Sequence, residues 1–299
     1  MNAPIIQARG LRKRFGKTEI LHGLDFTVPA GRIYGLIGHN GAGKTTTLNA
    51  VLGLTQCEGE VSVLGMDPFA NRARLMQQVA FMSDVASLPR YLRVSELFDL
   101  IEGIHPAFSR EKANAFLQGT DVRPRAKIRT LSKGMVAQLH LAVVMAIDAR
   151  LLVLDEPTLG LDITYRKRFY RRLLEDYMTE DRTLVITTHQ VDEIEFMLTD
   201  VIFIKEGRIA LDAPTEEVAE RYAQLVTSGD NASKAAALKP IYTETRFGQT
   251  VMLFDGADRE ALEALGEVTS PSLSDLFVAL MDRTTYNAEP ASSNERAAQ

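Results

Sequence analysis

Short apolar runs alternate with helical patterns over residues 4–213 of the chain. The runs at residues 33–37, 151–154 and 184–188 are rich in branched apolar side chains and predict strands buried on both faces. Residues 45–54, which follow the first run after a glycine turn, carry a pattern typical of a helix. This alternation predicts an α/β domain.

The remaining patterns of this domain are a short strand, a helix, a hairpin and a helical segment. Residues 61–64 predict the strand and residues 163–177 the helix. Residues 201–204 and 208–211 are separated by Lys-Glu-Gly and predict the hairpin. Residues 85–130 are mainly helical in pattern, with breaks at three prolines. We interpret them as a helical insertion between two parts of the sheet.

The composition becomes small and polar after residue 225, which predicts a linker over residues 226–237. The linker separates a first domain, residues 1–225, from a small C-terminal α+β unit, residues 238–284. Within that unit, Ser272 is placed to cap a final helix with one apolar face. Residues 285–299 predict a disordered tail.

Charge and cysteine content narrow the class of protein. The net charge of −5 disfavours a nucleic-acid partner, because neutralising phosphates requires a basic surface. Cys57 is the only cysteine, so the chain has no internal disulfide and suits a reducing compartment. We see neither a secretory signal nor an apolar run of about 18 residues. We therefore expect a cytoplasmic protein.

A phosphate-binding loop is the first candidate site. The segment from Gly38 to Thr45 fits the pattern G-x-x-x-x-G-K-[ST], follows a predicted strand and opens a predicted helix. In such a loop, backbone N–H groups and the helix N-terminus hold phosphates, Lys44 adds a positive charge, and the Thr45 hydroxyl can bind Mg²⁺. The alternative is a glycine-rich turn that only caps a helix. The candidate nucleotide-binding residues are Gly38, His39, Asn40, Gly41, Ala42, Gly43, Lys44, Thr45 and Thr46.

Two carboxylates, Asp155 and Glu156, follow a predicted buried strand. Ligands of open α/β sheets bind at the carboxyl ends of the strands, so both side chains would face a nucleotide. Asp155 would then hold Mg²⁺, and Glu156 would polarise the attacking water. The alternative is a strand-end aspartate that caps the next turn.

Four more segments complete a recognisable order around these two motifs. They are Phe15-Gly16, Leu131-Ser132-Lys133-Gly134-Met135, Gly160-Leu161-Asp162 and His189. Over residues 4–213 the set resembles the nucleotide-binding subunit of an ABC (ATP-binding cassette) transporter. The resemblance implies a P-loop NTPase core of the ABC ATPase type that binds and hydrolyses ATP with Mg²⁺.

The resemblance also assigns roles to single residues. Phe15 would stack on adenine, and His189 would contact the γ-phosphate and position water beside Glu156. Ser132 and Gly134 would close on the γ-phosphate held by a second subunit, and Asp162 would bridge to the phosphate loop of that subunit. Without the resemblance, Phe15 would be a packing residue and His189 a capped residue at a strand end.

The sequence departs from the family pattern at two positions. Met135 stands where the family usually has glutamine after the signature glycine, and a thioether cannot make the glutamine's hydrogen bonds. A branch that exports through separately encoded membrane subunits has a similar segment, so we do not interpret Met135 as inactivating. Asp84 stands where the family commonly has a glutamine near the metal. It is either a metal or water ligand or a plain loop residue.

The resemblance implies two partners. One is a second ATP-binding subunit, identical or homologous, because each chain has one phosphate loop. The other is a transmembrane permease docking between Ser83 and Arg93, which would hold the chain peripherally at the inner face of the membrane and work in export. The C-terminal residues 270–277 also resemble that branch. The alternatives are a soluble ABC ATPase acting on ribosomes or DNA, and a nucleotide-dependent regulator that does not hydrolyse ATP.

Overall fold

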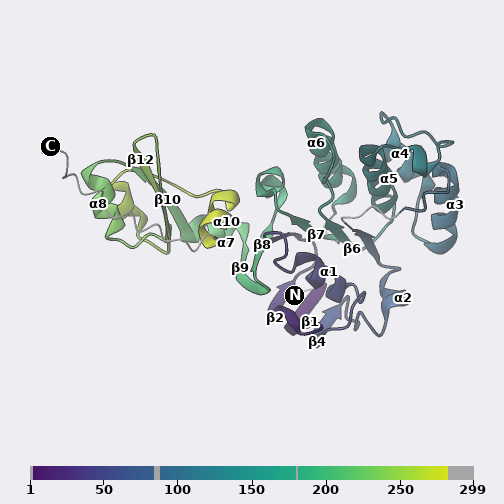
Figure 1. Cartoon of the computed structure of the whole chain (residues 1–299), viewed down its shortest axis with the longest axis horizontal. Coiled ribbons are helices and arrows are strands. Elements are labelled where there is room, and N and C mark those ends of the chain that lie inside the picture. Colours follow the sequence, from purple (N-terminus) through teal and green to yellow (C-terminus); the bar gives the residue numbers. More distant parts are fainter. Residues whose placement is uncertain (1–2, 84–87, 180, 282–299) are drawn as a thin grey trace, which may run out of the picture. The chain divides into compact units, whose positions relative to one another are not determined.

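The computed structural model describes residues 3–83, 88–179 and 181–281 of the chain. They belong to two compact units, Met1–Thr215 and Glu216–Gln299. Figure 1 shows the elements of both units coloured along the sequence. Among the described residues, no helix combines the length and the apolar character needed to cross a membrane.

A three-stranded antiparallel sheet opens the N-terminal unit. Its order is β2 (Thr18–Val28), β1 (Ile6–Phe15) and β4 (Glu58–Val63), so β1 pairs on both edges. Buried side chains of β1 and β2, such as Leu11 and Leu21, join one apolar core with residues of α1. This sheet therefore packs close to the helix that follows the predicted phosphate loop.

A second sheet of six strands forms the centre of the unit. Its order is β5-β6-β7-β3-β8-β9, and only the β8–β9 pair is antiparallel. The strands are β3 (Ile33–Ile37), β5 (Val79–Met82), β6 (Leu151–Asp155), β7 (Thr183–Thr188), β8 (Asp200–Lys205) and β9 (Arg208–Pro214). Every residue of β3, β6 and β7 is buried, as the continuous apolar runs predicted.

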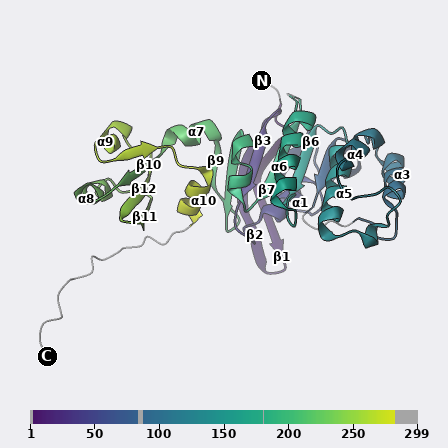
Figure 2. The same cartoon turned by 90° about the horizontal axis from the view of Figure 1, so that it is seen from above.

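The helices of this unit include α1 (Lys44–Val51), α2 (Arg72–Leu75) and α6 (Ile163–Arg172), which continues as a π-helical turn to Tyr177. Figure 2 shows α3 (Val94–Ile104), α4 (Arg110–Leu117) and α5 (Lys133–Met145) gathered beyond β6, at the end of the unit away from β9. Helices α3 and α4 lie within the segment predicted as a helical insertion.

The C-terminal unit begins with α7 (Thr215–Arg221) and follows the order strand, helix, strand, strand, helix, strand. These elements are β10 (Tyr222–Thr227), α8 (Asp230–Ala236), β11 (Tyr242–Arg246), β12 (Gln249–Asp255), α9 (Arg259–Glu263) and β13 (Glu267–Thr269), followed by α10 (Leu273–Met281). The sheet order β11-β12-β10-β13 is antiparallel throughout, which defines a ferredoxin-like split βαβ arrangement.

The linker predicted over residues 226–237 was wrong. This stretch includes the end of β10, which pairs with both β12 and β13, and all of α8. Its small side chains pack instead of connecting, since Ala235 is fully buried in the core of the unit. The first domain accordingly ends near Thr215, before the predicted residue 225. The predicted tail, residues 285–299, lies outside the described residues.

Candidate functional site

The segment from Gly38 to Thr45 forms a tight loop between β3 and α1. Gly41 and Gly43 have φ angles of 82° and 111°, which side chains with a Cβ rarely adopt. A Cβ on Gly38 would lie 2.6 Å from the carbonyl oxygen of Ile204. Such a loop brings its backbone N–H groups close to an anion at the start of a helix.

Lys44 places a positive charge over this loop. Lys44 is 6% exposed, and its Nζ donates a hydrogen bond to the Gly38 carbonyl at 2.6 Å. The same Nζ lies 3.6 Å from Glu156 Oε1. Lys44 therefore joins the loop to the acidic strand and is placed to neutralise phosphate oxygens.

A cleft of about 300 Å³ opens beside the loop. Its lining residues are Phe15, Ile20, His39, Asn40, Gly41, Gly43, Lys44, Thr45, Thr46, Asp155 and Glu156. Phe15, at the end of β1, is 55% exposed and forms part of the wall. An exposed aromatic ring beside a phosphate loop offers a stacking surface for a planar base.

Asp155 lies at the carboxyl end of β6 and is 1% exposed. Its Oδ2 accepts a hydrogen bond from Thr45 Oγ1 at 2.8 Å, and its Oδ1 accepts one from Thr187 Oγ1. The buried carboxylate is thus held from two sides, by the phosphate loop and by β7.

Glu156 has a backbone φ of 48°, a left-handed conformation that is uncommon outside glycine. Its N–H donates to Thr187 Oγ1 at 3.0 Å, and its Oε2 lies 2.9 Å from His189 Nδ1. A carboxylate accepts hydrogen bonds only, so His189 donates through Nδ1 and keeps Nε2 for a second partner. Glu156 and His189 together can orient a water molecule at the cleft.

The oxygen atoms of Thr45 and Asp155 suit a hard divalent cation. Their hydrogen-bond distance of 2.8 Å places a hydroxyl and a carboxylate at one point of the cleft wall. Within the described ranges, no group of three or more His, Cys, Asp or Glu side chains could hold a metal. This arrangement fits Mg²⁺, which typically takes one or two protein ligands and completes its shell with phosphate oxygens and water.

The residues that the resemblance assigns to the site of a second subunit do not line the cleft. Ser132 caps α5, its Oγ accepting from the Met135 N–H at 3.2 Å, and Asp162 caps α6, accepting from the Tyr165 N–H at 2.9 Å. Among the residues that the structure describes, the cleft wall includes neither of them, nor Gly134. Met135 contributes its backbone to the cap, so the departure from glutamine leaves the helix start intact.

The residues proposed for the metal and the permease are only partly described. Asp84 lies outside the described residues, and its predicted metal role stays a prediction. Of the predicted docking segment, Ser83 and residues 88–93 are described, and Tyr91 is 75% exposed.

Sequence reasoning missed Thr187 and Gly207. Thr187 is a buried polar residue near the carboxyl end of β7, two positions before His189, and the change from apolar to polar side chains at the end of the run was the available signal. Gly207 N–H donates to the Ala42 carbonyl at 2.9 Å, and its own carbonyl accepts from His22 N–H at 2.9 Å. Gly207 therefore ties the phosphate loop to β2, a long-range contact with no local pattern.

Comparison with known proteins agrees with this geometry. The model of the ABC transporter family matches residues 21–159. Nod factor export ATP-binding protein I of Burkholderia lata is 39% identical over 218 residues, which cover 70% of this chain and 71% of the relative. The protein of that name from a Rhizobium species is 28% identical over 302 residues, covering 95% and 99%. A solved ATP-binding subunit of an ABC transporter has a TM-score of 0.65 at 21% identity, covering 72% of this chain and 92% of its own.

The fold and the site define a P-loop nucleotide hydrolase, and these matches narrow that class. The chain belongs to the ABC transporter family as an ATP-binding subunit, and it is an ABC-type ATPase.

Proposed function

We propose that this chain closes with a second ATP-binding subunit around two ATP molecules and so drives a separately encoded membrane permease in export. The observation that carries the proposal is the division of the functional residues. Lys44, Asp155 and Glu156 line one cleft, whereas Ser132 and Asp162 cap helices outside its wall.

This division supports a site built from two chains. The Ser132 cap leaves the N-terminus of α5 exposed, and such a terminus attracts an anion. Placed over the cleft of a second chain, it would contact the γ-phosphate that Lys44 of that second chain holds. Two clefts closed in this way form a symmetric head-to-tail dimer with two composite sites.

The chain's own side chains then perform hydrolysis. Glu156 accepts a proton from water as the water oxygen bonds to the γ-phosphorus, and the bond to the β–γ bridging oxygen breaks to give ADP and phosphate. His189 holds Glu156 and the water in place, and Lys44 neutralises charge on the phosphate oxygens. A Mg²⁺ ion held by Thr45 and Asp155 would add to that neutralisation when bound.

The membrane partner is supported by the relatives and by the surface. Relatives carry names of export ATP-binding proteins, which implies a partner that spans the membrane. Tyr91, three-quarters exposed in the segment proposed for docking, offers an aromatic anchor of the kind enriched at interfaces. The chain would then work at the cytoplasmic face of the membrane.

A mixing experiment tests the two-chain site. Lys44→Ala inactivates the phosphate loop, and Ser132→Arg blocks the N-terminus of α5. We expect each variant alone to be inactive with the permease, while an equimolar mixture regains part of the phosphate release, since mixed dimers contain one undamaged site. A mixture of Lys44→Ala with Glu156→Gln is the control. Both substitutions lie in the cleft, so every site of a mixed dimer contains a damaged cleft. If the first mixture is as inactive as this control, the composite site is wrong.

A second readout concerns assembly. Glu156→Gln should bind ATP without turnover and accumulate as a dimer in Mg-ATP, measured by light scattering after size exclusion. Adding Ser132→Arg to it should return the monomer. A Glu156→Gln chain that stays monomeric with and without the permease would remove the dimer from the proposal.

A further inference from the structure

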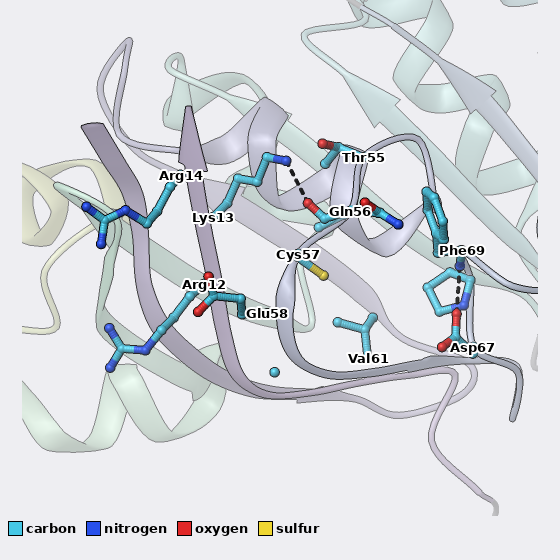
Figure 3. Close-up of a pocket in the computed structure, with 13 residues that line it drawn as sticks. Arg12, Lys13, Arg14, Thr55, Gln56, Cys57, Glu58, Val61, Asp67 and Phe69 are labelled. Atoms are coloured by element: carbon cyan, nitrogen blue, oxygen red, sulfur yellow. Dashed lines mark hydrogen bonds between the residues drawn. The ribbon is translucent and has the colours of Figure 1, made fainter. Parts of the chain in front are cut away.

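Lys13 makes two contacts that connect the wall of the nucleotide cleft to the loop after α1. Its Nζ donates to the carbonyl oxygen of Gln56 at 2.6 Å. The same Nζ lies over the Phe15 ring, 4.9 Å from the ring centroid. Figure 3 shows Lys13 reaching toward Gln56 across a cavity of about 440 Å³, while Arg12 and Arg14 point away from it.

The neighbouring basic residues of β1 have different partners. Arg12 pairs with Glu19 at 3.0 Å, and Arg14 donates to the Lys17 carbonyl at 3.4 Å. Lys13 is thus the member of this basic run whose charge lies against the aromatic wall of the cleft. A cation over an aromatic face is attracted by the negative potential of the ring.

Lys13 lies against one face of the Phe15 ring. One face is covered by the ammonium group, which the Gln56 carbonyl holds in place. The ring is nevertheless 55% exposed and lines the nucleotide cleft. The uncovered part of the ring is therefore the part available to a planar base.

We propose that Lys13 is a positioning residue, which holds the Phe15 ring in the orientation that receives the adenine base. The inference rests on the proposed stacking role of Phe15. Because Gln56 follows α1, the hydrogen bond from Lys13 to Gln56 also links the Phe15 ring to the helix that begins at the phosphate loop. The contribution should depend on the base and be independent of the phosphates.

ADP and inorganic pyrophosphate separate the contribution of the base from that of the phosphates, because both carry a diphosphate and only ADP carries the base. Their dissociation constants would be measured by calorimetry on the full chain. Lys13→Met keeps the length of the side chain and removes the charge, Lys13→Arg keeps the charge, and Arg14→Met is the matched control for lost charge on β1. Phe15→Ala and the double variant complete a thermodynamic cycle.

We expect Lys13→Met to weaken ADP binding about two- to fivefold. Pyrophosphate binding should change no more than in Arg14→Met, and Lys13→Arg should retain most of the ADP affinity. In the Phe15→Ala background, Lys13→Met should have no further effect on ADP.

Equal weakening of ADP and pyrophosphate by Lys13→Met would overturn the inference, because Lys13 would then act on the phosphates at a distance. Additive effects of Lys13→Met and Phe15→Ala would overturn it as well. If Phe15→Ala itself leaves ADP binding unchanged, the proposed stacking role of Phe15 is wrong, and so is the inference. Pyrophosphate binding abolished by Lys44→Ala would in that case still support the phosphate loop.

Discussion

Thr45 Oγ1 donates a hydrogen bond to Asp155 Oδ2 at 2.8 Å, although the two residues are 110 positions apart in the chain. The phosphate loop and the acidic strand therefore meet at this hydrogen bond. Parallel pairing of β3 with β7, and of β7 with β6, brings the carboxyl ends of these strands to one edge of the sheet. The proposed cation ligands are thus positioned by the sheet.

Replacing Thr45 by valine tests this pair. Valine has a similar shape but no oxygen, so we expect Mg²⁺-dependent ATP hydrolysis to fall by between about tenfold and a hundredfold, as for other lost partners in metal sites. Thr45→Ser keeps the hydroxyl and should retain most of the activity. The measurement is phosphate release against Mg²⁺ concentration. Activity retained in Thr45→Val would show that the hydroxyl oxygen is not needed and would contradict the prediction.

Thr187 should contribute both to stability and to catalysis. In Thr187→Val, the buried carboxylate of Asp155 loses one donor, and the Glu156 N–H loses one acceptor. We expect the free energy of unfolding to decrease by about 1–3 kcal/mol, with a lower rate of hydrolysis. Thr187→Ser, which keeps the hydroxyl, should lie close to the wild-type chain. Urea unfolding and steady-state turnover of both variants check the prediction.

Gly207 and Gly248 form a matched pair of turn glycines, with φ angles of 69° and 79°. A Cβ on Gly207 would lie 1.9 Å from the Ile20 carbonyl oxygen, whereas one on Gly248 would meet no atom within 4 Å. Both alanine variants carry the penalty of a left-handed backbone, and only Gly207→Ala adds the clash. We expect an additional loss of about 1–3 kcal/mol in the stability of its own unit.

The same pair separates function from general strain. Gly207 also holds the Ala42 carbonyl of the phosphate loop, so Gly207→Ala should weaken ADP binding, and Gly248→Ala should leave it unchanged. Calorimetric titration of both variants gives the answer. Unchanged affinity in Gly207→Ala would mean that the loop keeps its shape without this brace.

His140 should make the chain sensitive to mild acid. Burial in α5 lowers the pKa of His140 to about 4, from an ordinary value near 6.5 in the unfolded chain. Between these values the unfolded state binds a proton that the native state excludes, so stability falls as the pH drops below about 6.5. From pH 7 to pH 5 the wild type should lose about 2 kcal/mol more than His140→Leu, by urea unfolding. Parallel pH profiles of the two chains would contradict this assignment.

Local patterns were enough to predict the central strands and the phosphate loop. The runs that became β3, β6 and β7 are continuous and apolar because both faces of a central parallel sheet are covered. The C-terminal unit was harder, because α8 is built largely from small residues that also suit a linker. The bracing contacts of Lys13 and Gly207 depend on segments far apart in the chain, so periodicity could not predict them.

The strand that carries the phosphate loop has consequences for the order of synthesis. β3 lies between β7 and β8 in the sheet, yet both neighbours are encoded more than 140 residues later, as the pairs Ile33 with Leu184 and Tyr34 with Asp200 show. On a ribosome, the loop emerges early but has no paired support until β7 and β8 have followed. We therefore expect a nascent chain to acquire nucleotide affinity late, and to expose unpaired, strongly apolar strands until then. This is a stage at which a chaperone would bind it.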